Sequence, residues 1–273
     1  MIPPERLSLN TATVSQQWTL AECVEGCARH GIGGIGPWRN RLQEAGVEAG
    51  ARMIRDAGLT VTGLCRGGWF TGEGALTQAV LDDNRRAVDE AAAIDAACLV
   101  MVVGGLPSGS RDLAGAREMV AEGLARTTEY ARKAGVPIAI EPLHPMTAAD
   151  RSCVNTLGQA LDFCDQIGDG IGVALDVYHV WWDPELAAQI RRAGRDRLMA
   201  FHICDWLNPT KDLVTDRGMM GDGVIDIAGI RSMVEAEGFD GLAEVEIFSA
   251  GDWWTRDPDE VLSVMVERAR TSC

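Results

Sequence analysis

Short apolar segments alternate with longer stretches of helical spacing along the whole chain of 273 residues, and this alternation limits the fold more than any other feature. The apolar segments are rich in Val, Ile and Leu, and most of them follow a Gly or a turn. Such near-continuous apolar runs are typical of parallel strands that are buried on both faces. We predict eight strands: Leu7–Val14, Ile32–Trp38, Thr60–Cys65, Cys98–Gly104, Pro137–Pro142, Ile171–Tyr178, Leu198–Cys204 and Leu242–Phe248.

The stretches between these strands have the spacing and the end signals of helices. In the stretch Leu20–His30, the apolar residues recur every three or four positions and fall on one face. Further helices are predicted over Leu113–Lys133, Leu157–Ile167 and Glu260–Ala269, with capping residues, Gly or Pro at their ends.

Eight strand–helix units without a linker or low-complexity tract predict a single-domain (β/α)8 TIM barrel with a parallel eight-stranded core over residues 1–273. An open, doubly wound sheet is the alternative. In a TIM barrel, the catalytic groups lie at the carboxyl ends of the strands. The two long connections at 145–154 and 205–225 follow the fifth and seventh strands at that end.

The composition excludes several classes of protein. The chain has a formal net charge of −15, which argues against a nucleic-acid partner because phosphate binding needs a concentrated basic surface. No window approaches the ~20 apolar residues of a membrane span, and no secretory signal is evident. The eight cysteines lack metal-type spacing and are weak evidence for disulfides. For Cys23 and Cys27, which lie four residues apart on one predicted helix face, we expect buried, reduced thiols. We expect a cytoplasmic protein, and a homo-oligomer is compatible with the sequence.

Four residues with metal-binding side chains end four consecutive predicted strands: Glu141, Asp176, His202 and Glu246. An ionisable group at the end of a buried strand costs free energy unless it is paired or bound to a metal. In a barrel these four strand ends would converge on one point. Three carboxylates and one imidazole suit one divalent ion, Mn²⁺ first and Mg²⁺ or Co²⁺ as alternatives. The competing interpretation is that these residues cap helices or pair with arginines.

The motifs around these residues resemble the xylose-isomerase-like superfamily of sugar isomerases and epimerases. They are Ile140-Glu141-Pro142-Leu143-His144-Pro145, Leu175-Asp176-x-x-His179, Phe201-His202-Ile203-x-Asp205, Arg217…Gly221-Asp222-Gly223-x-Ile225-Asp226 and Glu244-Val245-Glu246-Ile247-Phe248. The superfamily includes ketose 3-epimerases, hydroxypyruvate isomerase, inosose isomerases and dehydratases, and endonuclease IV. The resemblance covers nearly the whole chain and is strongest from Pro137 to Trp254.

The resemblance implies a role for each of these residues. Four of them would ligate the metal: Glu141, Asp176, His202 and Glu246. His179 and Arg217 would contact the substrate, and Glu141 and Glu246 would also act as the catalytic acid/base pair around a metal-stabilised enediolate.

For two further residues near these motifs, His144 and Glu244, the sequence leaves more than one role open. His144 is a candidate for substrate binding from the loop after the fifth strand, and a surface position is equally compatible with the sequence. Glu244 lies two residues before Glu246, so it faces the same side of its strand about 7 Å deeper. For Glu244 we expect a partner arginine in the barrel interior rather than the metal.

Tryptophan is concentrated at one end of the predicted barrel. Seven of the eight tryptophans lie at or just after the carboxyl ends of strands: Trp38, Trp69, Trp181, Trp182, Trp206, Trp253 and Trp254. This placement predicts an aromatic pocket for a carbohydrate, with Trp38, Trp69, Trp181 and Trp206 as binding residues. Some of the seven are expected to pack under loops or at a subunit interface instead.

The sequence favours a metal-dependent isomerase or epimerase acting on a non-phosphorylated sugar, keto-sugar or inositol ketone. The signals of a phosphate site are weak, because Asp222 and Asp226 bring negative charge to the loop where it would lie. A lyase or dehydratase on a 3-keto sugar or inosose, including C-glycoside cleavage, is the alternative, and a sugar-binding barrel without catalysis is a third. The nucleases of the superfamily need additional histidines that this chain, with only four, does not offer.

Overall fold

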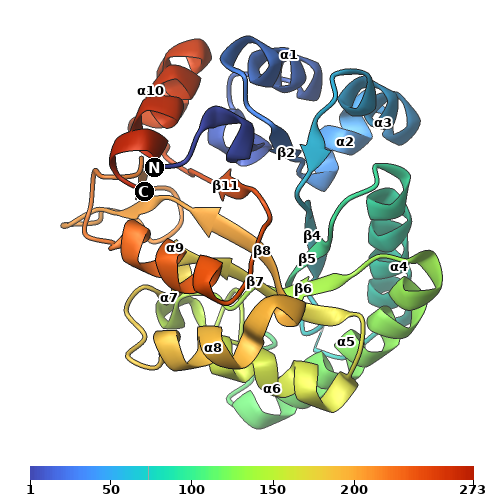
Figure 1. Ribbon diagram of the computed structural model, residues 1–273. Helices are drawn as coiled ribbons and strands as arrows, with labels where there is room; N and C mark the ends of the chain where they lie inside the picture. Colours follow the sequence, from blue (N-terminus) through green and yellow to red (C-terminus); the bar gives the residue numbers. More distant parts are fainter. Residues whose placement is uncertain (73) are drawn as a thin grey trace.

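The computed structural model describes residues 1–72 and 74–273, in which helices surround a parallel sheet (Figure 1). All neighbouring strands of this sheet are parallel. In spatial order the strands are β3 (Thr60–Val61), β2 (Gly34–Gly36), β1 (Leu7–Asn10), β11 (Ala243–Val245), β8 (Leu198–Ile203), β7 (Ile171–Asp176), β6 (Ile138–Ile140), β5 (Leu99–Val102) and β4 (Leu64–Gly68).

The two ends of this sheet, β3 and β4, are consecutive in the chain, and together they correspond to the predicted strand Thr60–Cys65. β3 pairs with β2, and β4 pairs with β5. Across the gap, the backbone N–H of Cys65 donates to the carbonyl of Pro37 at 2.9 Å, and Trp38 forms a parallel bridge with Cys65. The prediction of a TIM barrel is therefore confirmed, and the alternative of an open doubly wound sheet is wrong.

Helices cover the outside of the barrel and bury their apolar faces against the strands in one continuous core (Figure 1). Their bounds are α1 (Leu20–His30), α2 (Arg39–Ala45), α3 (Val47–Asp56), α4 (Gln78–Ala93), α5 (Leu113–Ala134), α6 (Leu157–Ile167), α7 (Val177–Val180), α8 (Leu186–Arg197), α9 (Ile227–Ala236) and α10 (Pro258–Thr271). The long connection after β8 contains an antiparallel pair, β9 (Asp205–Trp206) and β10 (Arg217–Gly218). All eight cysteines are free and buried, and this confirms the prediction made for Cys23 and Cys27.

Most strands are shorter than predicted, and capping side chains end two of them. The predicted strand Leu7–Val14 ends at Asn10, whose side chain accepts a hydrogen bond from the backbone N–H of Ala12 and starts a 3-10 turn. The predicted strand Ile171–Tyr178 ends at Asp176, whose carboxylate caps α7 in the same way. An apolar run thus continues past the point where the backbone leaves the sheet.

Inside the barrel, one layer of side chains consists of three alanines and one glutamate: Ala139, Ala174, Ala200 and Glu244. All four are buried, and each lies two residues before a predicted metal ligand, so both side chains face the barrel interior. The Glu244 carboxylate also lies against β2, where a Cβ at Gly36 would be 2.3 Å from its Oε1. Short alanines and a glycine therefore leave space for one long side chain.

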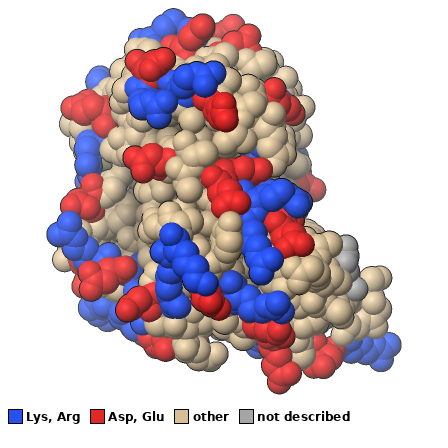
Figure 2. All heavy atoms as spheres, turned by 90° about the vertical axis from the view of Figure 1, so that its right-hand side faces the viewer, with Lys and Arg blue, Asp and Glu red and all other residues tan. Residues whose placement is uncertain are grey.

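The outer surface carries charges of both signs. On the face that Figure 2 shows, lysines and arginines lie beside aspartates and glutamates rather than in one basic area. Within the described parts of the chain, no helix combines the length and apolar character needed to cross a membrane.

Candidate metal centre and active site

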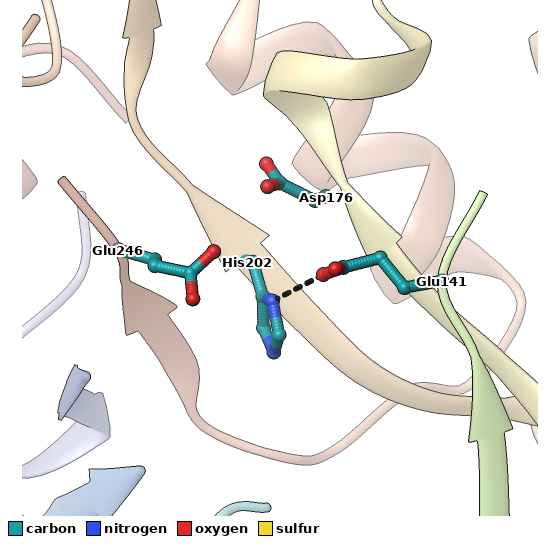
Figure 3. A group of neighbouring side chains, drawn as sticks. All are labelled: Glu141, Asp176, His202 and Glu246. Atoms are coloured by element: carbon teal, nitrogen blue, oxygen red, sulfur yellow. Dashed lines mark hydrogen bonds and ion pairs between the residues drawn. The ribbon is translucent and has the colours of Figure 1, made fainter. Parts of the chain in front are cut away.

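The structure brings the four predicted ligands together at the carboxyl end of the barrel (Figure 3). Glu141 follows β6, Asp176 ends β7, His202 lies near the end of β8 and Glu246 follows β11. One potential ligand atom from each of the four lies within 4.8 Å of the others, and all four side chains are buried. Figure 3 shows Glu141 and Glu246 reaching this point from opposite sides of His202.

Mutual proximity changes the ionisation of two of these groups. Burial raises the pKa of Glu141 to about 7, and the charges of Glu246 and Asp176 add to this rise, while the hydrogen bond from His202 opposes it. Burial alone would lower the pKa of His202. The negative charge of Glu244 and the hydrogen bond to Glu141 outweigh burial and raise this pKa to about 10. The cluster thus has an excess of negative charge that attracts a proton.

The donor set fits one divalent cation. Ligand atoms within 4.8 Å of one another need only small side-chain movements to reach the usual 2.0–2.2 Å from a shared ion. The Nδ1 atom of His202 lies 3.1 Å from Oε1 of Glu141 and faces the other ligands, while Nε2 has no hydrogen-bond partner among the described residues. Three carboxylates would be neutralised largely by such an ion, which would contribute Lewis acidity there.

Glu244 does not have the arginine partner that the sequence led us to expect. Its carboxylate accepts hydrogen bonds from Asn10 Nδ2 at 2.6 Å and from the hydroxyl of Thr62. Its Oε1 atom lies 3.6 Å from Nε2 of His202. Glu244 therefore lies below the ligand cluster, behind the imidazole, where it can hold the ring with Nδ1 toward a metal.

Arg217 and His179 line the same site. The Nη1 atom of Arg217 donates to Asp176 Oδ2 at 2.9 Å and to Glu246 Oε2 at 3.1 Å, so this arginine ties two of the ligands together. The backbone N–H of His144 donates to Nδ1 of His179. Burial lowers the pKa of His179 to about 3, so the ring is neutral near pH 7 and carries one proton. Its Nε2 atom lies 3.6 Å from Oδ2 of Asp176 and 3.2 Å from Nη2 of Arg217.

A cavity lies over the cluster. Its lining includes Glu141, Glu246, His179 and Arg217, together with Trp38. Trp38 packs edge-on against Phe248, with 5.5 Å between the ring centroids. Of the four tryptophans predicted to bind substrate, Trp38 alone is in this lining.

The other predicted aromatic contacts lie outside that cavity. Trp206 contacts the rings of Trp181, Tyr178 and His144, with 4.7 Å between its centroid and that of His144. These four rings pack together beside the site and support His179 through the backbone of His144. Trp69 borders a neighbouring hollow. The concentration of tryptophan at this end of the barrel therefore reflects packing around the site more than a continuous aromatic slot.

Two charged residues of the cavity lining were not among our candidates. Arg66 and Arg151 both line the cavity with the ligand carboxylates. Arg66 lies at an irregularity of β4, where the pairing with β5 shifts register between Cys65 and Gly67. The sequence contains no motif at either position. The two arginines could have been proposed as site residues only because they are isolated basic residues after the predicted strands Thr60–Cys65 and Pro137–Pro142.

Comparisons with known proteins agree with the fold and the motifs. Residues 24–266 match the model of the family described as xylose isomerase-like TIM barrel. A structure of a Sinorhizobium meliloti protein superposes with a TM-score of 0.96 at 59% identity, covering 98% of each chain. A structure of the IolI protein with a bound zinc atom has a TM-score of 0.81 at 19% identity, covering 98% of this chain and 99% of that one.

Among curated relatives, an inosose isomerase of Halalkalibacterium halodurans is 28% identical over 129 residues. That alignment covers 46% of this chain and 44% of the relative, so the chain spans less than half of the relative's length. The family match covers most of the chain, with the ligand motifs inside it. The chain belongs to the xylose isomerase-like TIM barrel family.

Proposed function

We propose that this protein is a divalent-metal-dependent isomerase or epimerase of a non-phosphorylated sugar, keto-sugar or inositol ketone. The observation that carries the proposal is the placement of Glu141 and Glu246 on opposite sides of the ligand cluster, beneath the cavity (Figure 3). The similarity to an inosose isomerase supports the same class of reaction. Mn²⁺ is the ion we propose, and the zinc in the IolI structure makes Zn²⁺ the comparison to include.

Two carboxylates facing one substrate position can move a proton between its two sides. A bound divalent ion would polarise the substrate carbonyl and acidify the neighbouring C–H. One of Glu141 and Glu246 would remove that proton, and the other would return a proton to the opposite face, which gives epimerisation. Return to the adjacent carbon gives isomerisation.

His179 and Arg217 would orient the substrate. The neutral His179 ring lies in the cavity lining, where it would hydrogen-bond a carbonyl or hydroxyl group of the substrate. Arg217 is buried and already bonded to Asp176 and Glu246, so we assign it to holding these two carboxylates in place while it borders the cavity.

The alternative of a lyase acting on an aryl-bearing substrate depended on a long aromatic slot. In the described residues, Trp38 and Phe248 are the aromatic side chains of the cavity lining. Trp181 and Trp206 are engaged with Tyr178 and His144 instead. We therefore propose the isomerase or epimerase.

Proton exchange tests the proposal directly. Metal-loaded protein is incubated in D₂O with ketoses and keto-inositols, and NMR measures deuterium next to the carbonyl. We expect uptake with at least one substrate, loss of uptake in Glu246→Gln, and normal uptake in Glu118→Gln, which changes an exposed glutamate of α5. Failure of the metal-loaded protein to exchange a proton of any of these compounds would refute the proposal.

A further inference from the structure

Two arginines face the catalytic cavity without a charged partner. The side chains of Arg66 and Arg151 make no hydrogen bond or ion pair with any residue that the structure describes. Both are only partly exposed, and the Nε atom of Arg66 is buried. The other arginines that lack a partner in the described chain are exposed to solvent: Arg52, Arg55, Arg111, Arg191 and Arg270. Arg66 and Arg151 thus differ from every other arginine of this acidic chain.

The position of Arg66 is fixed by its surroundings. It is the extra residue where the β4–β5 register shifts, and such irregularities redirect a side chain. Its guanidinium lies 4.3 Å from the ring centroid of Trp69 and 6.0 Å from that of Trp38. Aromatic faces hold a guanidinium in place while leaving its N–H donors free. Burial lowers the pKa of Arg66, and the positive charge of Arg151 lowers it further, which indicates that the two charges lie near each other.

The charges of the cavity do not balance without a further anion. A divalent ion together with Arg217 would compensate the carboxylates of Glu141, Asp176 and Glu246. Even if Glu244 in the layer below is counted, one positive charge from the arginine pair remains. A buried charge without a partner costs free energy, so a ligand that supplies the missing anion would bind favourably.

We propose that Arg66 and Arg151 form a subsite for a carboxylate of the substrate, which makes the substrate a keto-sugar acid rather than a neutral sugar. This inference rests on the proposed function and adds the chemical class of the substrate. A guanidinium fork matches the two oxygens of a carboxylate. A carboxylate suits the cavity better than a phosphate does, because the part of the lining that the structure describes contains no glycine-rich turn to supply backbone N–H groups.

Binding of three ketoses that differ only at C6 tests this subsite. D-fructuronate, D-fructose and D-fructose 6-phosphate carry a carboxylate, a hydroxyl and a phosphate at that carbon. Calorimetry with the Mn²⁺-loaded full chain should show that fructuronate binds at least tenfold more tightly than either of the others. Arg66→Met and Arg151→Met should each remove most of that preference while leaving fructose affinity within twofold. Arg52→Met, which removes an exposed charge of α3, should leave all three affinities unchanged.

Several results would overturn the inference. Equal binding of fructuronate and fructose would do so, as would a fructuronate preference that survives both substitutions. Preference for fructose 6-phosphate would replace the carboxylate by a phosphate. If Arg66→Met fails to fold, Arg66→Lys and Arg151→Gln provide the test, since lysine keeps the charge but loses the fork. Binding does not require turnover, so arginine-dependent fructuronate binding without deuterium exchange would refute only the proposed function, and exchange limited to neutral ketoses would refute only the subsite.

Discussion

The contact between Glu244 and His202 should control how tightly the protein binds metal. Glu244→Gln keeps the size of the side chain and one acceptor oxygen behind the imidazole but removes the negative charge. If Glu244 holds the His202 ring with Nδ1 toward the metal, the variant should fold normally and bind Mn²⁺ more weakly.

The expected size of the effect follows from the geometry. A hydrogen bond to a charged acceptor contributes about 1.5–3 kcal/mol, and one to a neutral acceptor about 0.5–1.5 kcal/mol. The His202–Glu244 separation of 3.6 Å is longer than an ordinary hydrogen bond, so the loss should lie near the low end, about 1–1.5 kcal/mol. At about 1.4 kcal/mol per factor of ten, Mn²⁺ affinity should fall roughly tenfold.

Competition with a fluorescent chelator at pH 7.5 measures the affinity. The matched control is Ser8→Ala, because the Ser8 hydroxyl lies 2.8 Å from that of Thr62 in the same buried network but makes no hydrogen bond with His202 in the described structure. This control should bind Mn²⁺ within twofold of the wild type. In the Zn²⁺-loaded protein, ¹⁵N NMR should also place the His202 proton on Nε2. Unchanged Mn²⁺ affinity in Glu244→Gln, or a proton on Nδ1, would refute the positioning role.

Three further outcomes are expected. Glu141→Gln and Glu246→Gln should each lower turnover at least ~10²-fold. Elemental analysis of the same samples separates loss of metal from loss of proton transfer. If either variant keeps near-normal turnover at full metal content, the substituted glutamate is not the acid or base. Burial lowers the pKa of His179 from 6.5 to about 3, so the unfolded chain binds the proton first as the pH falls. Stability from this group is therefore complete above pH 6.5 and is lost below it at about 1.4 kcal/mol per pH unit. In urea titrations of metal-free protein, His179→Gln should reduce this slope, and an unaltered slope would contradict the assignment. Finally, Gly123→Ala places a Cβ 2.3 Å from the ring of Phe70. This crowding should cost more than the ~1 kcal/mol gained in helix propensity, so a raised urea midpoint would argue against it.

The barrel and its ligand cluster could be predicted from the sequence because both follow from periodic patterns. Apolar runs identified the strands, and an ionisable residue at the end of a run identified each member of the buried cluster: Glu141, Asp176, His202 and Glu246. The strand ends were less predictable, since Asn10 and Asp176 end their strands through side-chain hydrogen bonds that hydrophobicity does not report.

Contacts between distant parts of the chain could not be predicted in this way. The partners of Glu244 are Asn10 and Thr62, which lie 234 and 182 residues away in the chain. The sequence predicted the end of the barrel at which the tryptophans lie. The orientation of their rings depends on neighbours such as Tyr178, which packs against Trp206. Arg66 was not predicted as a site residue. It stands out because it lines the cavity without a charged partner in the described structure, and no sequence pattern reveals the absence of a partner.

The layer of three alanines and one glutamate beneath the predicted ligands limits which substitutions the barrel interior can accept during evolution. A valine in place of Ala139, Ala174 or Ala200 would add volume to the barrel interior that also holds Glu244, and any side chain at position 36 would meet the Glu244 carboxylate. A lineage that replaces Glu244 by a small residue frees the same space and permits larger neighbours. Positions 36, 139, 174, 200 and 244 should therefore change together among descendants of a common ancestor, while the four ligands one layer above stay the same.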